Sequence, residues 1–369
     1  MKKVKFYTSI NQVEEISEEE KETLKPITDK YVFRANDYYL SLIDWDNPDD
    51  PIRKIIIPNS NELNEYGQWD ASDEAKNYVV PGCQHKYKTT ALLVVSQVCG
   101  AYCRFCFRKR LFNNEHDEVH INPQLGIDYI RNHPEINNVL LTGGDSLMLS
   151  TKRLRNIIEQ LREIDHVKII RLGSKLPVFN PMRIYQDEEL LDLIRTYSTP
   201  EKRIYVMAHV NHPNEITDEA RKAFDALHEA GAIVMNQTPV LKGINDDPNA
   251  LAELLDKLSW TGVHPYYFFI NRPVAGNYDF VHPLKTVYEI VEEAKAKTSG
   301  LGKRVRLAMS HSSGKIEILA IKDGKAYLKY HQAKHGNYGE VMVLDCPDDA
   351  TWFDELPGHE EYVKEEVEV

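Results

Sequence analysis

Residues 91–110 of the chain read ALLVVSQVCGAYCRFCFRKR. The first part, ALLVVSQ (91–97), is a short apolar run rich in β-forming residues, which predicts a buried strand. Three cysteines, Cys99, Cys103 and Cys106, follow it directly in a C-x3-C-x2-C pattern. The stretch therefore predicts a β-strand whose carboxyl end carries a cluster of thiols.

The chain has two other cysteines, Cys83 and Cys346, and both are remote from the cluster. An odd number of cysteines with this spacing does not fit a disulfide scaffold, whereas clustered thiolates suit an iron–sulfur cluster or zinc. A zinc site would need a fourth protein ligand, and no second CxxC or paired histidine follows at zinc-finger spacing. Three cysteines on a [4Fe–4S] cluster would leave one iron open to another ligand. Three unrelated loop cysteines are the remaining interpretation.

From residue 91 onward, strand patterns alternate regularly with helix patterns. Five more strand-like runs follow the first, at 137–143, 166–172, 203–210, 232–238 and 266–271. Amphipathic helical patterns follow the six strands, at 123–133, 150–164, 187–197, 217–231, 247–259 and 283–297. Six such repeats predict parallel strands with right-handed crossovers. We therefore expect an α/β fold, a partial (β/α)6 TIM-like barrel that is open on one side.

The remaining segments are expected to surround this barrel, which we assign to residues 86–299. Residues 1–85 are irregular and rich in Asn, Asp and Pro, which predicts an N-terminal wrapping segment. Residues 300–369 would form a small C-terminal cap. The cap ends in EEYVKEEVEV (360–369), which we expect to be a solvated acidic tail.

Polar or glycine-rich residues follow all six predicted strands. They are the three cysteines, Gly143-Gly144-Asp145, Gly173-Ser174, HVNHPNE (209–215), Asn236-Gln237 and Asn271-Arg272. Barrel enzymes assemble their sites at the carboxyl ends of the strands. We therefore expect these six groups to meet at one mouth of the barrel.

Composition excludes some classes of partner. The formal net charge is −12, with 57 acidic and 45 basic residues. Nucleic-acid affinity comes mostly from Lys and Arg contacts with phosphates, so this balance argues against DNA or RNA as a partner. The start, MKKVKFYTSI, lacks the apolar core of a secretory signal, and no stretch approaches the roughly 18 apolar residues of a membrane span. We expect a soluble, cytoplasmic protein without a membrane partner.

Five stretches together resemble a known superfamily and one of its branches. CGAYCRFC (99–106) and LLTGGDSLML (140–149) resemble radical S-adenosylmethionine (SAM) enzymes. The branch is identified as lysine 2,3-aminomutase by GSKLPV (173–178), HVNHPNEIT (209–217) and NQTPVLKGIND (236–246). The resemblance covers roughly residues 75–320. It implies that the open iron binds SAM, that SAM is cleaved to a 5′-deoxyadenosyl radical, and that this radical abstracts hydrogen from the substrate.

The resemblance assigns roles to the residues at the strand ends. Cys99, Cys103 and Cys106 would hold the [4Fe–4S] cluster. The SAM contacts would come from Gly143, Gly144, Asp145, His209 and Gln237, the first three receiving its amino group. The two glycines would let the backbone approach SAM closely, although such a pair is also typical of a tight βα turn.

Aminomutases of this family also bind pyridoxal phosphate through a lysine in a glycine-rich loop. The matching stretch here, SHSSGKIEI (310–318), predicts Lys315 as the catalytic lysine. HKYKTT (85–90) matches another cofactor-binding stretch, so Lys86 and Tyr87 would contact the phosphate and the ring. Two departures weaken the match: Ser-His-Ser-Ser replaces the glycine run, and Thr90 replaces a cofactor-contacting arginine. A surface lysine on a hairpin is the alternative for position 315.

Two arginines are predicted to bind the substrate. Arg108 matches the family arginine that binds the α-carboxylate, for which a bidentate guanidinium is suited; a solvated basic run is the alternative. Arg272 and Ala308 stand where lysine-specific members carry two aspartates. A like charge would disfavour lysine, so an acidic or hydrogen-bond-accepting side chain fits better. Alternatively, Arg272 pairs structurally with Asp279 or Glu317.

The predicted function is thus that of a radical SAM 2,3-aminomutase, an isomerase that moves the α-amino group of a free amino acid to the β-carbon. The substrate is expected not to be lysine and to carry an acidic side chain. One alternative is a radical SAM enzyme that uses no pyridoxal phosphate or modifies a protein lysine. Another is a non-catalytic iron–sulfur or zinc protein. The expected partners are a small-molecule amino acid, an electron donor such as flavodoxin or ferredoxin, and further copies of the chain in a homo-oligomer.

Overall fold

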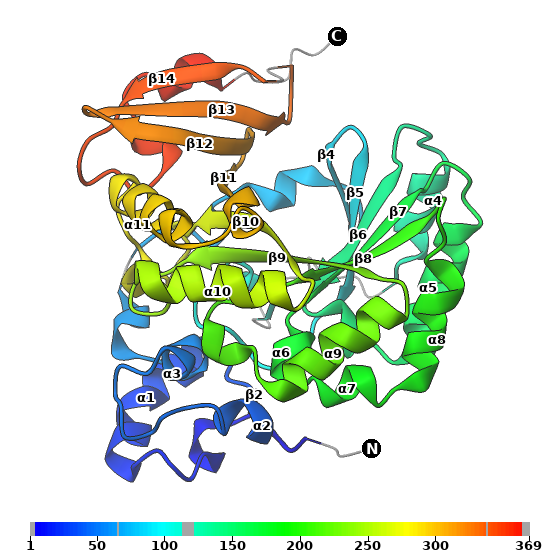
Figure 1. Ribbon diagram of the computed structural model, residues 1–369, viewed down its shortest axis with the longest axis horizontal. Coiled ribbons are helices and arrows are strands. Elements are labelled where there is room, and N and C mark those ends of the chain that lie inside the picture. The colour runs from blue at the N-terminus through cyan, green and yellow to red at the C-terminus, as the bar shows by residue number, and fades with distance from the viewer. Residues whose placement is uncertain (1–3, 65, 113–121, 337–338, 364–369) are drawn as a thin grey trace.

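One open sheet forms the frame of the protein. The structure is a computed structural model that describes residues 4–64, 66–112, 122–336 and 339–363 (Figure 1). In that part of the chain, a 12-stranded sheet runs in the order β14-β13-β12-β11-β10-β9-β8-β7-β6-β5-β4-β3. The six predicted strands are confirmed as parallel neighbours: β5 (Thr90–Ser96), β6 (Asn138–Gly143), β7 (Ile169–Ser174), β8 (Arg203–Ala208), β9 (Ile233–Val240) and β10 (His264–Ile270). Because β3 and β14 are the two ends of the sheet and do not pair with each other, the expected partial barrel is confirmed.

The six predicted helices are also confirmed, and they cover the outer face of the sheet (Figure 1). They are α4 (Gln124–Arg131), α5 (Thr151–Arg162), α8 (Glu188–Tyr197), α9 (Asp218–Glu229), α10 (Pro248–Trp260) and α11 (Leu284–Lys297). Side-chain caps fix where they begin: Ser150 accepts from the Arg153 N–H, and Thr217 from the Ala220 N–H. Such caps satisfy backbone donors that the first helical turn leaves unpaired. The short helices α6 (Leu176–Phe179) and α7 (Met182–Tyr185) add two unpredicted turns between β7 and α8.

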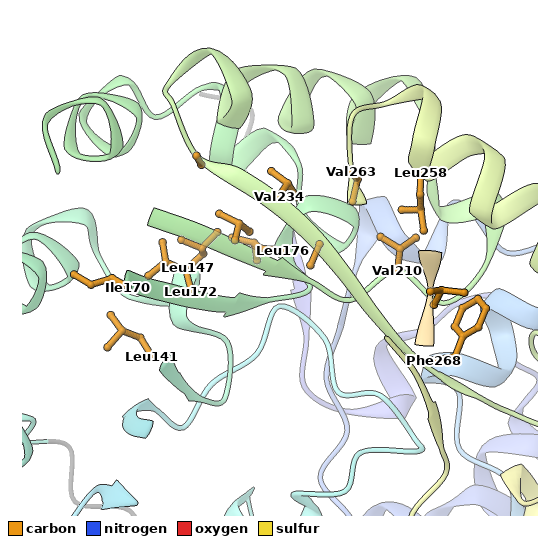
Figure 2. Close-up of a cluster of buried hydrophobic side chains, with 14 of the residues drawn as sticks. Leu141, Leu147, Ile170, Leu172, Leu176, Val210, Val234, Leu258, Val263 and Phe268 are labelled. Atoms are coloured by element: carbon orange, nitrogen blue, oxygen red, sulfur yellow. The ribbon is translucent and has the colours of Figure 1, made fainter. Parts of the chain in front are cut away.

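The core lies between the sheet and these helices. Leu141, Ile170 and Val234, on alternate positions of their strands, are fully buried and pack toward the helices (Figure 2). Intervening residues, such as Arg171, are only partly buried and face the inside of the barrel. Because successive strand residues point to opposite faces, polar side chains can line the barrel while the outer face stays apolar.

The barrel sheet continues into the segment assigned to the C-terminal cap. β11 (Arg306–His311) pairs in parallel with β10, and α11 provides the crossover to it. The chain then turns into an antiparallel meander of β12 (Gly314–Lys322), β13 (Lys325–Ala333) and β14 (Val341–Asp345). Lys315 therefore lies where the parallel barrel gives way to the antiparallel cap. Residues 364–369 of the predicted acidic tail lie outside the described residues.

The N-terminal segment is more ordered than its composition predicts. It contains α1 (Glu18–Lys30), α2 (Asp37–Leu40) and α3 (Pro51–Ile56), with the short strands β1 (Phe6–Tyr7) and β2 (Ala35–Asn36). These elements share a second hydrophobic cluster, separate from that of the barrel. The last part adds β3 (Tyr78–Val80) and β4 (Cys83–Tyr87) to the sheet beside β5.

Short 3-10 turns complete the described chain. They are η1 (Ile10–Gln12), η2 (Ser60–Leu63), η3 (Glu74–Asn77), η4 (Lys109–Phe112), η5 (Ser146–Met148), η6 (Pro213–Glu215), η7 (Tyr278–Phe280), η8 (Gly302–Arg304), η9 (Phe353–Glu355) and η10 (His359–Tyr362). None of the described helices has the length and apolar character that crossing a membrane requires.

We predict that Tyr39→Phe destabilises the protein more than Tyr38→Phe. The Tyr39 hydroxyl donates to the fully buried carboxylate of Glu215, whereas the Tyr38 hydroxyl bonds the neutral Thr217 hydroxyl at 2.7 Å. Losing a hydrogen bond to a charged group costs about 1.5–3 kcal/mol, and losing a neutral one about 1 kcal/mol. Urea unfolding measures both changes in free energy; equal losses would show that Tyr39 does not anchor the N-terminal segment to the barrel.

Candidate active site

The cysteine loop is fastened to the end of β6. The Gly144 N–H donates to Ser96 O at 2.6 Å, and the Asp145 N–H donates to Val98 O at 3.0 Å. The Cys106 N–H donates to Cys103 O at 3.1 Å, so the loop turns back on itself between these two thiols. The ends of β5 and β6, which the sequence predicts to meet at one mouth of the barrel, are therefore in contact.

Glycines are required at positions 143 and 144 by the protein's own backbone. A Cβ on Gly143, whose φ is +110°, would lie 2.6 Å from Ser96 O, and one on Gly144 would lie 2.7 Å from Val98 O. A side chain at either place would push the cysteine loop away from the barrel. The two glycines therefore allow the backbone at Ser96 and Val98, just before Cys99, to approach them closely.

The three thiols sit partly buried among one another and among cations. Burial raises the pKa of Cys99 well above its usual range and that of Cys103 to about 12, and the neighbouring thiols act in the same direction. Burial also raises the pKa of Cys106, although Arg108 and Lys109 oppose it. Thiolates in this setting need compensating positive charge, which bound metal supplies. The donor set therefore fits a cationic iron–sulfur core.

A site for a single metal ion is not formed by these residues. Within the described ranges, no three His, Cys, Asp or Glu side chains lie close enough together to hold one ion. An iron–sulfur cluster differs because each thiolate binds a separate iron. Cys83 is fully buried and Cys346 nearly so, each within the main hydrophobic cluster, as small apolar side chains are.

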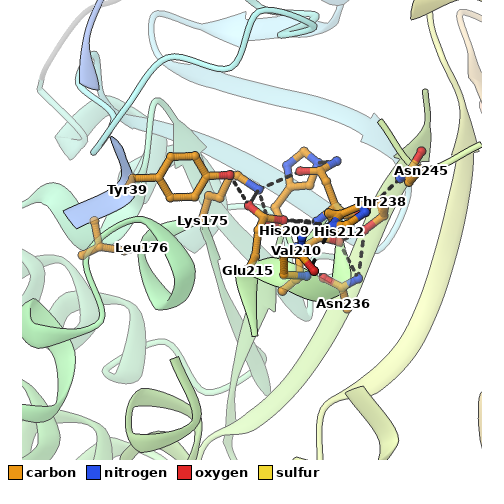
Figure 3. A network of polar contacts seen from close by, with 12 residues as sticks. Tyr39, Lys175, Leu176, His209, Val210, His212, Glu215, Asn236, Thr238 and Asn245 are labelled. Carbon is orange, nitrogen blue, oxygen red and sulfur yellow. Dashed lines mark hydrogen bonds and ion pairs between the residues drawn. The ribbon is translucent and has the colours of Figure 1, made fainter. Parts of the chain in front are cut away.

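A buried polar network lies beside the cysteine loop (Figure 3). Lys175, from GSKLPV, forms an ion pair with Glu215 and donates to His209 O at 2.8 Å and to Asn211 Oδ1 at 2.7 Å. The second Glu215 oxygen accepts from the backbone N–H groups of Asn211 and His212. This network fixes the loops that follow β7 and β8.

The Asp145 carboxylate is occupied by hydrogen bonds from the protein's own backbone. It accepts from the backbone N–H groups of Leu147 at 2.9 Å, Lys175 at 2.8 Å and Leu176 at 3.1 Å. Burial nevertheless raises the pKa of Asp145 to about 6. Its side chain therefore locks the loops after β6 and β7 together, and its expected contact with SAM stays a prediction.

His209 and Gln237 lie on the inner side of the same mouth. The His209 ring contacts the Phe105 ring edge-on at a centroid distance of 5.8 Å, which places it against the cysteine loop. Burial and the nearby Lys175 charge lower the pKa of His209 to about 3, so the ring is neutral at neutral pH. Gln237 on β9 is half-buried and follows the buried Asn236. The Asn236 side-chain amide accepts from the Val210 N–H and donates to Thr238 Oγ1. Their SAM contacts stay predictions.

A cluster of arginines surrounds one carboxylate, that of Glu74 in η3. The Arg108 Nε and Nη2 donate to the two Glu74 oxygens, each at 3.1 Å. Arg108 Nη1 donates to Thr142 Oγ1 at 2.9 Å, and Arg110 Nη2 donates to Glu74 at 3.1 Å. Arg108 is 7% and Arg110 2% exposed, so the alternative of a solvated basic run is wrong.

Arg272 completes this cluster. Its guanidinium lies over the Phe107 ring, 3.9 Å from the centroid, and its Nη1 is 3.9 Å from Glu74 Oε1. The structural pairing with Asp279 or Glu317 is wrong, since Asp279 accepts from Asn61 at 2.8 Å and Glu317 lies 3.5 Å from Arg306. Burial would raise the pKa of Glu74, but Arg108, Arg272 and Arg110 outweigh it and lower the pKa to about 2.

Lys315 lies next to this cluster at the start of β12. Its ammonium is partly buried and lies 4.2 Å from the Tyr267 ring centroid, so the alternative of an exposed surface lysine is wrong. Burial, then the charges of Arg171, Arg272 and Lys86, lower the pKa of Lys315 to about 7. At neutral pH much of this amine is therefore unprotonated and nucleophilic.

Lys86 lies near Lys315, and its ammonium is 5.5 Å from the centroid of the Tyr87 ring. Lys86 donates to His311 O in the loop that carries Lys315, and burial, with Arg272, lowers its pKa to about 7. Burial also raises the pKa of Tyr87. A partly unprotonated Lys315 beside the charges of Arg171 and Arg272 fits a phosphorylated aldehyde, because the amine can bond its carbonyl while the guanidinium groups attract the phosphate.

Several contributing residues were not predicted from the sequence. Glu74 belongs to a segment interpreted as irregular. Phe107 lies in the stretch that carries the cysteines and Arg171 in a predicted strand, but the sequence assigned neither a role at the site. A signal for Arg171 existed, because a lone arginine in the middle of a buried strand pattern demands a polar partner. A cavity of about 330 Å³ also opens nearby, lined by Gly67, Asp70, Pro273, His311 and Asp354 among others.

Comparison with known proteins agrees with this geometry. The sequence model of the Radical SAM superfamily matches residues 93–255. The chain is 51% identical over 356 residues to a protein of Aquifex aeolicus (strain VF5) provisionally named L-lysine 2,3-aminomutase, covering 96% of this chain and 95% of that protein.

Two further relatives are longer than this chain. It is 38% identical over 288 residues to the L-lysine 2,3-aminomutase of Clostridium subterminale, covering 77% of this chain and 68% of that protein. It is 35% identical over 298 residues to the glutamate 2,3-aminomutase of Clostridioides difficile (strain 630), covering 79% and 68%. The chain therefore belongs to the lysine 2,3-aminomutase family of the radical SAM superfamily.

Proposed function

We propose that this protein is a 2,3-aminomutase that moves the α-amino group of a free amino acid with an acidic side chain to the β-carbon. Family membership implies a [4Fe–4S] cluster, SAM and pyridoxal phosphate as cofactors. The observation that carries the choice of substrate is Arg272, which lies over Phe107 in a cluster of three arginines with one carboxylate. Such a pocket attracts anions and repels an ammonium group.

In this proposal, Cys99, Cys103 and Cys106 hold the cluster, and Gly143, Gly144, Asp145, His209 and Gln237 surround SAM. When bound, the cluster and SAM supply the hydrogen-abstracting radical chemistry. The neutral His209 can donate or accept one hydrogen bond without adding charge. The electron needed for this chemistry would come from a small redox protein such as flavodoxin or ferredoxin.

Lys315 is proposed to bind pyridoxal phosphate, with Lys86 and Tyr87 beside it. The bound cofactor supplies the chemistry by which an amino nitrogen migrates between adjacent carbons. The protein's part is to keep much of the Lys315 amine unprotonated, mainly by burying it, and to attract the phosphate with positive charge. Arg171 is suited to the second task, which would compensate for the arginine that Thr90 replaces, whereas Lys86, whose pKa is lowered to about 7, adds only a partial charge.

Arg108 is proposed to bind the substrate α-carboxylate and Arg272 the side-chain carboxylate. The Arg272 guanidinium lies over the Phe107 ring, which limits the orientations in which Arg272 can meet a planar anion. Binding at both ends fixes the amino-bearing carbon between the two arginines.

We predict that Cys106→Ala abolishes both the cluster and SAM cleavage. Protein reconstituted anaerobically with iron and sulfide would lose its broad visible absorbance, and dithionite-driven production of 5′-deoxyadenosine would fall to background. Cys346→Ala is the matched control, because this cysteine is buried within the hydrophobic core of the cap. A Cys106→Ala variant that still makes 5′-deoxyadenosine contradicts the assignment of the ligands.

We predict that borohydride reduction of the holoprotein attaches a phosphopyridoxyl group to Lys315. Because the pKa of Lys315 is lowered to about 7, loading should rise with pH around 7, whereas an ordinary lysine titrates above 10. Peptide mass spectrometry locates the adduct, and Lys315→Met is the control. A protein whose cluster forms while Lys315 stays unmodified is not an aminomutase, and the search moves to radical SAM reactions without pyridoxal phosphate.

We predict that Arg272→Asp shifts the substrate preference from acidic toward basic amino acids. The change replaces a cation with an anion at the pocket, so kcat/KM for L-glutamate-like substrates should fall at least about 100-fold. Arg304→Asp, on the exposed η8, makes the same charge change away from the site. Profiling of product amino acids measures both variants, and an unchanged profile for Arg272→Asp rejects the assignment.

A further inference from the structure

Arg108 already binds a carboxylate side-on in this structure. Its Nε and Nη2 edge holds both oxygens of Glu74, and its Nη1 donates to Thr142 Oγ1. A planar carboxylate bound side-on by two parallel N–H groups is the arrangement that guanidinium recognition favours. Glu74 therefore occupies the place where a substrate carboxylate would bind if Arg108 has its proposed role.

A second position for Glu74 already exists beside the first. The Glu74 oxygen that accepts from Arg108 Nε also accepts from Arg110 Nη2 at 3.1 Å. Arg110 also lies 3.5 Å from Asp70 and is 2% exposed, so it stays buried in either state. Rotation of the Glu74 side chain toward Arg110 would free Arg108 without leaving the carboxylate unpaired, which would be costly.

The backbone of Glu74 is anchored, so only the side chain needs to move. The Glu74 and Ala75 N–H groups both donate to the Asp70 carboxylate, at 2.9 and 2.8 Å. The same segment is tied to the barrel mouth, because Ser72 Oγ donates to Ser310 O at 3.1 Å and the Gln68 N–H to Pro273 O at 2.9 Å. The segment thus presents one carboxylate to the arginines from a fixed position.

We propose that Glu74 is an internal competitor of the substrate, which holds Arg108 when the pocket is empty and passes to Arg110 when an α-carboxylate binds. The proposal rests on the assignment of Arg108 to the α-carboxylate. The apparent affinity for any amino acid is then reduced by the fraction of protein in which Glu74 occupies Arg108. Displacing Glu74 from Arg108 costs binding free energy. Only ligands that also bind Arg272 offset this cost, so ligands with weak contacts elsewhere bind poorly.

The test measures binding without turnover. Holoprotein reconstituted anaerobically with its cluster and pyridoxal phosphate, but without SAM, is titrated calorimetrically with L-glutamate and with L-alanine, which share the α-carboxylate. Glu74→Gln should lower the Kd of both by about tenfold, because a neutral amide holds Arg108 less tightly. Glu74→Asp, which keeps the charge but is one methylene shorter, should give an intermediate Kd. An unchanged or higher Kd for both variants overturns the proposal.

A matched control separates competition from loss of a buried charge. Glu62 is also a buried carboxylate between two cations, Arg104 at 2.7 Å and Lys109 at 3.2 Å, but it lies outside the arginine cluster. Glu62→Gln should lower the melting temperature without lowering either Kd. If Glu62→Gln also binds the ligands more tightly, the lowered Kd of Glu74→Gln comes from a general loss of rigidity in the protein, and the proposal is overturned.

Failure of the proposal and failure of the Arg108 assignment give different results. If Arg108→Met binds both ligands as the unchanged protein does, Arg108 is not the carboxylate site. If Arg108→Met weakens binding while Glu74→Gln does not tighten it, only the competition is overturned. In the double variant Arg108→Met/Glu74→Gln, the gain from Glu74→Gln should disappear.

Discussion

The buried ion pair between Lys175 and Glu215 is the interaction on which the mouth of the barrel depends. Taking two such charges out of water costs roughly several kcal/mol per ion, and this cost is offset only when hydrogen bonds satisfy the remaining donors and acceptors. Here they do: Glu215 accepts from Tyr39 and two backbone N–H groups, and Lys175 donates to His209 O and Asn211. The pair thereby joins the loops after β7 and β8 to the N-terminal segment. The loops that face the cysteines are fixed before any cofactor binds.

Charge is distributed unevenly between the two halves of the site. Beside the cysteines, Glu215 is paired with Lys175, and Asp145 accepts hydrogen bonds from three backbone N–H groups. Beside Lys315, cations outnumber carboxylates, since Arg108, Arg110, Arg272 and Lys86 are set against Glu74 and, at Arg110, Asp70. A phosphate and a dicarboxylate together would restore neutrality there. Burial is the main cause of the lowered pKa of Lys315, and the same positive charges lower it further, so they both attract anions and help to activate the nucleophile.

The sequence predicted the repeated strands and helices of the barrel, but not the individual side-chain contacts between distant parts of the chain. Six strands and six helices were readable because each obeys a period of two or 3.6 residues over a full element. β11 was missed because RLAMSH is short and mixes apolar with polar residues, and α1 because Pro26 and many charged residues obscure its pattern. The cysteines were found from their spacing, and Lys315 through resemblance. Glu74 and Phe107 were not, because their importance comes from side chains that meet across 34 to 198 residues of chain, which no local pattern records.

The order in which the chain is synthesised has a consequence for the thiols. Cys99, Cys103 and Cys106 leave the ribosome long before Lys175 and Glu215, the residues that enclose their loop. At 5–20 residues per second, the intervening chain takes roughly 5–20 s to make. During that interval the nascent thiols are open to oxidation. In the folded protein the three thiols are partly buried, which reduces the access of oxidants to them. Folding of the barrel thus also protects the residues proposed to hold the cluster.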